Sequence, residues 1–158
     1  MDLEHGRAPG QALARLPELV ESLSETDRQL FYRIFDLRRV TGQLRVPESM
    51  ADWVAERFGD VATVETQQIV KITNRITLEG TLYNPLRGER PLDMVSNQDV
   101  LAAIENTRGG PFCTPESLTP EDVFGRVRGQ HCLTASNVAK YDGYHGLVVF
   151  DEHNPLLF

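Results

Sequence analysis

Three polar residues near the end of the chain form the pattern with the clearest chemical meaning. Asn137, His145 and His153 follow one another at intervals of eight, and the apolar run GLVVF at 146–150 lies between the two histidines. Such a run is typical of a buried strand, and a side chain at a strand end can point into a cleft. The amide of Asn137 both donates and accepts hydrogen bonds, which suits a ligand with hydroxyl groups. The alternatives are a turn at Asn137, a structural hydrogen bond at His145 and a surface position for His153.

Three cations are candidates for phosphate binding. Arg87 and Arg90 carry guanidinium groups, which match two phosphate oxygens at once. Lys140 precedes the turn signal Asp142-Gly143 and is placed to face a phosphate, while Asp142 is expected to serve the turn itself. A solvated surface role for each cation is the competing interpretation.

Residues 133–158 resemble the segment of histidine-triad proteins in which a polar residue ends one strand and a histidine opens the next. The resemblance implies that Asn137 binds the two hydroxyls of a ribose and that His145 and His153 bracket the pocket floor. It also implies that neither histidine is the nucleophile, because the family's nucleophile comes from a later H-x-H-x-H or H-x-H-x-Q motif. The sequence contains no such motif.

A second resemblance lies upstream, at residues 84–91 (NPLRGERP) and 110–113 (GPFC). Both are similar to segments of galactose-1-phosphate uridylyltransferases, where a C-x-x-C pair can take part in a zinc site. Gly110 stands in place of the first cysteine, and a closed zinc site needs about four nitrogen or sulfur ligands. The other candidates, Cys132, His131 and His145, are not local to Cys113. We therefore leave metal and cofactor content open and expect a small buried thiol at Cys113.

These resemblances imply a truncated nucleotidyltransferase-like protein that binds a nucleotide or a nucleotide sugar. Such enzymes form a nucleotidyl-histidine intermediate, so we expect this chain alone to be inactive. Its apolar end, Leu156-Leu157-Phe158, favours truncation over completeness. The alternative is a non-catalytic nucleotide-binding or protein-interaction module that is complete as given. A serine or cysteine hydrolase is disfavoured, because Cys113 has no histidine near it in sequence.

Composition excludes several other classes of function. The chain has 158 residues and a net charge of −7, with a pI near 5.1. Its densest basic cluster is the pair Arg38–Arg39, so nucleic acid is not expected as a principal ligand. No apolar stretch approaches the length of a membrane span, and the first ten residues lack the apolar core of a signal peptide. Two cysteines without a disulfide pattern suggest a cytoplasmic protein, and a homodimer is possible.

Apolar periodicity predicts the elements that position these residues. A 3.6-residue period predicts helices over 27–40 and 47–58 that pack together. The period then changes to two, which predicts strands over 63–72 and 75–82. Ser96 is expected to begin a third helix, with Asp99 completing a capping box.

The remaining segments predict a loop and then a strand pair. Residues 111–129 are rich in Pro, Gly and acidic residues and read as a loop, with a helical turn opening at 119–122. An antiparallel hairpin is expected at 131–151, at the heart of a sheet. Together these predict an α+β fold with an incomplete histidine-triad-like antiparallel sheet. The expected division is a mainly helical region at 1–72 and a partial nucleotide-binding domain at 73–158.

Overall fold

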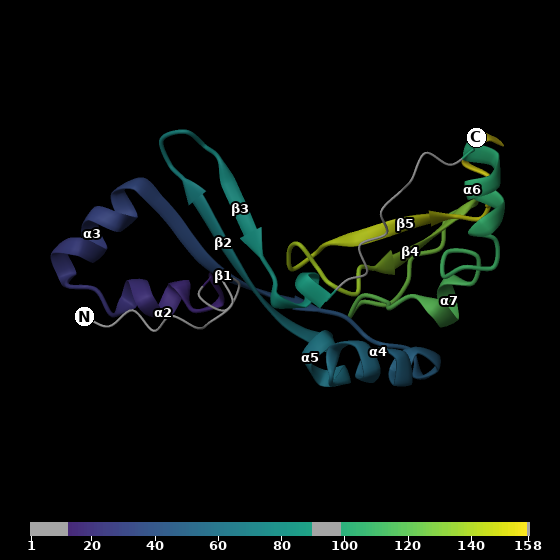
Figure 1. Ribbon diagram of the computed structural model, residues 1–158, viewed down its shortest axis with the longest axis horizontal. Coiled ribbons are helices and arrows are strands. Elements are labelled where there is room, and N and C mark those ends of the chain that lie inside the picture. The colour runs from purple at the N-terminus through teal and green to yellow at the C-terminus, as the bar shows by residue number, and fades with distance from the viewer. Residues whose placement is uncertain (1–12, 90–98, 158) are drawn as a thin grey trace.

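The computed structural model describes residues 13–89 and 99–157, which form an elongated arrangement of helices and small antiparallel sheets (Figure 1). The α-helices are α2 (Leu16–Glu21), α3 (Glu25–Ile34), α4 (Ala51–Phe58), α5 (Val61–Glu65), α6 (Val100–Asn106) and α7 (Pro115–Leu118). The strands are β1 (Phe35–Gln43), β2 (Thr66–Asn74), β3 (Gly80–Tyr83), β4 (Cys132–Ser136) and β5 (Gly146–Phe150). Short 3-10 helices lie at Glu48–Met50 (η1), Pro85–Glu89 (η2) and Pro155–Leu157 (η3). The mixed α+β class is as predicted, whereas Arg90 and Ser96 lie outside the described residues.

Helix α3 runs directly into the longest strand pair. Ser24 caps the helix through its side-chain oxygen, which accepts a hydrogen bond from the Asp27 amide at 3.2 Å. The backbone becomes extended at Phe35, and β1 then pairs antiparallel with β2 along its whole length. The predicted helix over 27–40 is therefore wrong beyond Ile34. Phe35 and Leu37 fit a two-residue period as well as a helical one, and pairing with β2 decides between them.

The hairpin between β2 and β3 is tighter than the sequence pattern indicated. Strand β2 confirms the strand predicted over 63–72 from Thr66 onward, whereas residues 63–65 belong to helix α5. The strand predicted over 75–82 is wrong in its first half. The Asn74 side-chain oxygen accepts hydrogen bonds from the amides of Ile76 and Thr77, which folds the chain into a turn. Leu78 adopts a positive φ of 61° in this turn. Ile76 and Leu78 are exposed, so their alternation marks no buried face.

The hydrophobic core is formed mainly by residues between 44 and 86, together with Ala139. Its buried members are Leu44, Met50, Val54, Val64, Leu86 and Ala139. Helix α4 confirms most of the helix predicted over 47–58, and it ends at Gly59 in the left-handed conformation that favours glycine. The expected packing of this helix on the one before it is wrong. In Figure 1, α3 lies beside β1, whereas α4 packs against α5.

The C-terminal hairpin is the prediction that the structure confirms most fully. Strands β4 and β5 pair antiparallel from Cys132↔Phe150 to Ser136↔Gly146. The expectation of a strand buried on both faces is wrong, because Val148 and Phe150 are more than half exposed on the outer face of β5. Within the described residues β4 and β5 form a two-stranded sheet, so the hairpin is not at the heart of a larger one.

The helical elements before β4 also differ in part from the predictions. Asp99 itself is the N-cap of α6, since its side chain accepts a hydrogen bond from the Leu101 amide at 3.1 Å. The single helical turn expected at 119–122 lies instead at α7, just before it. The region expected to be mainly helical, 1–72, contains β1 and most of β2 in addition to its helices. Among the described residues no helix is long and apolar enough to cross a membrane.

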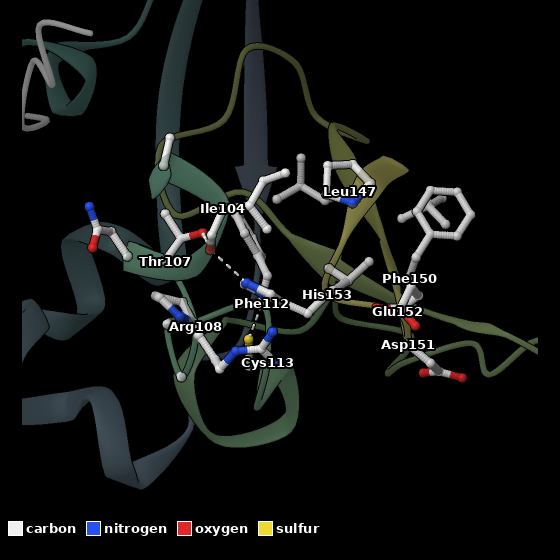
Figure 2. A pocket seen from close by; sticks show the side chains of 18 of the residues that line it. Ile104, Thr107, Arg108, Phe112, Cys113, Leu147, Phe150, Asp151, Glu152 and His153 are labelled. Carbon is white, nitrogen blue, oxygen red and sulfur yellow. Dashed lines mark hydrogen bonds between the residues drawn. The ribbon is translucent and has the colours of Figure 1, made fainter. Parts of the chain in front are cut away.

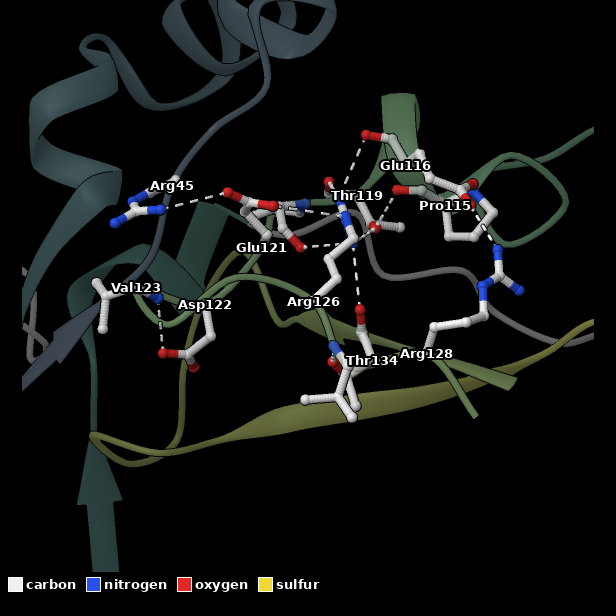
Figure 3. Close-up of polar contacts among 12 residues, drawn as sticks. Arg45, Pro115, Glu116, Thr119, Glu121, Asp122, Val123, Arg126, Arg128 and Thr134 are labelled. Carbon is white, nitrogen blue, oxygen red and sulfur yellow. Dashed lines mark hydrogen bonds and ion pairs between the residues drawn. The ribbon is translucent and has the colours of Figure 1, made fainter. Parts of the chain in front are cut away.

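Arg126 holds the loop around α7 against β4 (Figure 3). Its side chain is only 11% exposed. Its guanidinium donates to the Thr119 carbonyl at 2.6 Å and to the Thr119 hydroxyl at 3.1 Å. Longer bonds reach the carbonyls of Glu116, Pro120 and Thr134. One cation therefore satisfies several carbonyls of a loop that has little regular structure.

Ser136, the last residue of β4, offers a test of packing at the strand end. It is 1% exposed, and its hydroxyl has no hydrogen-bond partner among the described residues. Because an unpaired buried hydroxyl is unfavourable, Ser136→Ala is expected to leave the free energy of unfolding unchanged or to raise it by up to about 1 kcal/mol. Urea unfolding measures the difference.

Thr134 on the same strand provides the matched control for Ser136. Its hydroxyl accepts a hydrogen bond from the Val127 amide at 2.8 Å. Thr134→Val is therefore expected to lower the free energy of unfolding by about 1 kcal/mol. A loss of similar size in Ser136→Ala would show that the serine hydroxyl has a partner after all.

Candidate functional site

The two segments that carry the sequence resemblances meet in the structure. Asn84 is 3% exposed, and its amide nitrogen donates to the Gln67 side chain at 2.7 Å and to the Lys140 carbonyl at 2.8 Å. Its side-chain oxygen accepts a hydrogen bond from the Leu86 amide at 3.1 Å. All the hydrogen-bonding groups of this amide side chain point inward, so Asn84 joins the segments and is not available to a ligand.

Arg87 makes the second connection between these segments. Its guanidinium donates to the Ala139 carbonyl at 2.9 Å and to the Tyr141 hydroxyl at 2.5 Å. The same group lies over the Tyr141 ring, 3.4 Å from the ring centroid. Two hydrogen bonds and the contact with the aromatic ring fix the orientation of the guanidinium. Arg87 is half-buried, and it keeps further N–H donors beyond these two.

His145 is oriented by the turn that precedes β5. Its Nδ1 accepts a hydrogen bond from the Tyr141 amide at 3.1 Å, and the two rings pack with their centroids 5.2 Å apart. Since a backbone N–H only donates, a neutral His145 ring carries its proton on Nε2. The turn therefore decides which nitrogen of His145 is a donor.

Asn137 follows the last residue of β4, so it lies at a strand end as expected. It is half-buried, and its side-chain oxygen accepts a hydrogen bond from the Ala139 amide at 3.2 Å. This contact forms a local turn. The Asn137 amide nitrogen makes no hydrogen bond to the part of the chain that the structure describes, which leaves a donor for another partner.

Lys140 is placed differently from the other candidates. Its side chain is 0% exposed, and Nζ lies 3.0 Å from the Asp122 carboxylate. Nζ also donates to the Gly143 carbonyl at 3.2 Å. A phosphate would reach Lys140 only if this buried ion pair opened, so the role that the geometry gives Lys140 is structural.

Asp142 serves the turn, as expected. One of its carboxylate oxygens accepts a hydrogen bond from the Gly143 amide at 2.7 Å, and the other contacts Lys71. The hydrogen bond from Lys71, followed by that from the Gly143 amide, holds the pKa of Asp142 below its ordinary value. Because its pKa is lowered in the folded state, the ionised Asp142 carboxylate stabilises the fold at pH values above the pKa of the unfolded chain. This stabilisation is lost as the pH falls through the lower pKa of the folded state.

Arg87, Asn137 and His145 all contact the backbone of the segment between β4 and β5, at residues 139 and 141. Lys140 belongs to the same segment, but its side chain is buried. Sequence reasoning did not single out Asn84 or Tyr141, which position Arg87 and its neighbours. The Asn-Pro pair at 84–85 reads as an ordinary turn signal. Nothing in the sequence indicates that its side chain reaches the backbone of residue 140, 56 positions away.

A cavity of about 1340 Å³ lies at a different place, between α6, the loop 107–113 and β5. Phe112, Leu147 and Phe150 form part of its wall (Figure 2). Cys113 and His153 also line it, with the thiol sulfur 3.2 Å from Nδ1 of His153. Cys113 is exposed, so the expectation of a buried thiol there is wrong. His153 is half-buried, and its two ring nitrogens contact the Cys113 sulfur and the Ile104 carbonyl oxygen.

No family model, curated protein or solved structure matches this chain. The chemistry of the site therefore rests on its own residues. Arg87 and His145 supply hydrogen-bond donors suited to phosphate oxygens, and Asn137 supplies an amide suited to hydroxyls. None of these side chains is an activated nucleophile in this arrangement, so the cluster has the composition of a binding site.

The residues present do not fit the zinc site that the upstream resemblance implies. No group of three or more histidine, cysteine and acidic side chains suited to a metal ion occurs among the described residues. A Cβ atom at Gly110 would lie 2.9 Å from the Thr107 carbonyl oxygen. A cysteine at position 110 would thus require the backbone to move, and Cys113 with His153 provides only two of about four ligands.

Proposed function

We propose that this chain binds a nucleotide or nucleotide sugar, as part of a nucleotidyltransferase-like protein related to galactose-1-phosphate uridylyltransferases. The observation that carries the proposal is the contact of Arg87 with Ala139 and Tyr141. It joins the segment that resembles uridylyltransferases to the segment that resembles histidine-triad proteins.

The proposed site has a role for each of the clustered residues Arg87, Asn137, Lys140 and His145. The amide nitrogen of Asn137 donates to a ribose hydroxyl, while its oxygen keeps the turn bond to Ala139. Arg87 contacts phosphate oxygens, a common use of guanidinium donors, and His145 lines the site beside the Tyr141 ring. Lys140 keeps the turn in place from below through its ion pair with Asp122. The nucleophile is not assigned to any of these residues.

The ribose contact is tested with a pair of variants at one position. Asn137→Ala is expected to weaken binding of a nucleoside diphosphate about tenfold, because about 1.4 kcal/mol of hydrogen bonding is a factor of ten. Asn137→Asp keeps an oxygen for the Ala139 amide and offers acceptors to the ribose hydroxyls, so its affinity is expected to stay within about threefold. Calorimetric titration with UDP, GDP and ADP measures both.

Matched ligands and melting curves separate ribose binding from a purely structural role. Wild-type protein is expected to bind UDP more tightly than 2′-deoxy-UDP, and Asn137→Ala is expected to bind the two equally. A lowered melting temperature in Asn137→Ala with unchanged affinity would instead make Asn137 a turn residue. If folded wild-type protein bound none of the three nucleotides, a non-catalytic interaction module would be favoured.

A further inference from the structure

Cys113 and His153 form a hydrogen-bonded pair that the nucleotide-binding cluster does not use. The Cys113 sulfur lies 3.2 Å from Nδ1 of His153, and Nε2 of His153 lies 2.8 Å from the Ile104 carbonyl oxygen. Figure 2 shows the imidazole held between these two partners. The pair joins residues that are 40 positions apart, which the sequence alone did not bring together.

The Ile104 carbonyl determines which nitrogen of the His153 imidazole carries a proton. A carbonyl oxygen only accepts hydrogen bonds, so Nε2 of His153 carries a proton. In the neutral ring Nδ1 is then unprotonated and accepts the thiol hydrogen of Cys113. This is the arrangement of a nucleophile, a base and a group that orients the base. It requires no metal ion, in keeping with the poor fit of these residues to a zinc site.

The surroundings favour access by a small organic molecule. Cys113 is exposed and lines the cavity of about 1340 Å³, whose volume exceeds that of most small-molecule sites. Phe112 and Phe150 supply apolar wall surface for an organic substituent. The thiol is therefore reachable and lies beside a surface that can hold a reagent.

We propose that Cys113 is a reactive thiol that exchanges with small organic disulfides, with His153 as its base. Nδ1 of His153 takes the thiol proton as the Cys113 sulfur attacks one sulfur of the disulfide. The S–S bond of the reagent breaks, a new bond to the Cys113 sulfur forms, and the departing thiolate receives the proton from His153. The products are a mixed disulfide on the protein and one free thiol, so no further oxidant is required.

Several charged groups lie near this pair. Glu105 in α6 and Arg108 just after it bind each other at 2.8 Å. Asp151 and Glu152 line the cavity just after β5, and Asp151 is paired with Arg128 at 2.8 Å. Because a free cysteine is only a few per cent ionised at neutral pH, the base matters most there. The effect of His153 is therefore expected at neutral pH and not at alkaline pH.

The two cysteines of the chain allow an internal comparison. Cys132→Ser leaves Cys113 as the only thiol, and Cys113→Ser leaves the half-buried Cys132. With dithiobis(nitrobenzoate) at neutral pH, the Cys113 thiol is expected to react about tenfold faster than the Cys132 thiol. Incubation with glutathione disulfide, followed by intact mass, is expected to give one adduct in Cys132→Ser. Equal rates for the two thiols would overturn the proposal.

The role of His153 is tested in the Cys132→Ser background. His153→Gln is expected to lower the rate about tenfold at neutral pH. The difference should vanish at strongly alkaline pH, where hydroxide ionises the thiol without a base. His131→Gln, at an exposed histidine beside Cys132, is the control and should leave the rate unchanged.

Two results would show that the pair is something else. If His153→Gln in the Cys132→Ser background reacted at neutral pH as fast as Cys132→Ser itself, His153 would not act as the base. One equivalent of zinc retained by purified protein, with a thiol that reacts only after chelation, would make the pair metal ligands. If His153→Gln does not fold by thermal melting, the comparison of the two cysteines decides the proposal alone.

Discussion

Replacing Lys140 by methionine is expected to lower the free energy of unfolding by about 3–5 kcal/mol, because it leaves a buried carboxylate without its cation. Lys140 is 0% exposed and Asp122 is 10% exposed, with Nζ 3.0 Å from the carboxylate oxygen. Methionine keeps most of the aliphatic side chain of lysine and leaves little empty space. The loss of stability therefore comes from removing the charge and not from creating a cavity. Chemical denaturation of both proteins measures the change.

A more accessible ion pair nearby serves as the control for Lys140. Lys71 and Asp142 are 34% and 45% exposed, so Lys71→Met is expected to cost under about 1 kcal/mol. Adding Asp122→Asn to Lys140→Met removes the stranded charge, and the double variant should be more stable than the sum of the two single losses implies. Strict additivity, or a loss in Lys140→Met no larger than in Lys71→Met, would contradict a structural ion pair.

Arg126→Met is expected to destabilise the protein by a similar amount, through lost hydrogen bonds to the loop around α7. The two shortest bonds, both to Thr119, are hydrogen bonds from a charged donor. Such bonds are worth about 1.5–3 kcal/mol each, so the expected loss is about 3–6 kcal/mol. Arg126→Lys keeps the charge but not the planar fork, and it should recover about half of the loss.

Arg128 provides the control for Arg126 on the same segment. It binds Glu116 and Asp151 on the surface, with its side chain 53% exposed. Arg128→Met is expected to lower the free energy of unfolding by under about 1 kcal/mol. Equal melting temperatures for Arg126→Met and Arg128→Met would mean that the buried Arg126 guanidinium does not stabilise the loop around α7.

Local patterns predicted the elements whose partners are close in sequence. The hairpin 131–151 follows from an apolar run and an Asp-Gly turn, and α4 follows from its helical period and Gly59. The error at 35–40 has a physical cause. Apolar residues at Phe35 and Leu37 satisfy both periods, and the choice depends on β2, which lies about thirty residues later.

The candidate site was predictable in its residue types and not in its contacts. The strand-end position of Asn137 follows from the sequence pattern, because a strand end is a local feature. The burial of Lys140 does not, since its partner Asp122 lies 18 positions earlier in an irregular loop. The same holds for Cys113, whose histidine comes from beyond β5. Tertiary contacts, which no local period encodes, decide both.

The location of the core has a consequence for how the protein is made on the ribosome. Ala139 packs with Leu44 in the core, and Gln67 donates to the Val138 carbonyl 71 positions away. The β1–β2 ribbon can pair soon after it leaves the exit tunnel, but the core beneath it stays open until Ala139 emerges. Contacts of such long sequence separation form slowly. The core around α4 and α5 is therefore completed only when Ala139 has been translated, and until then the surface that Ala139 covers is open to chaperones and to aggregation.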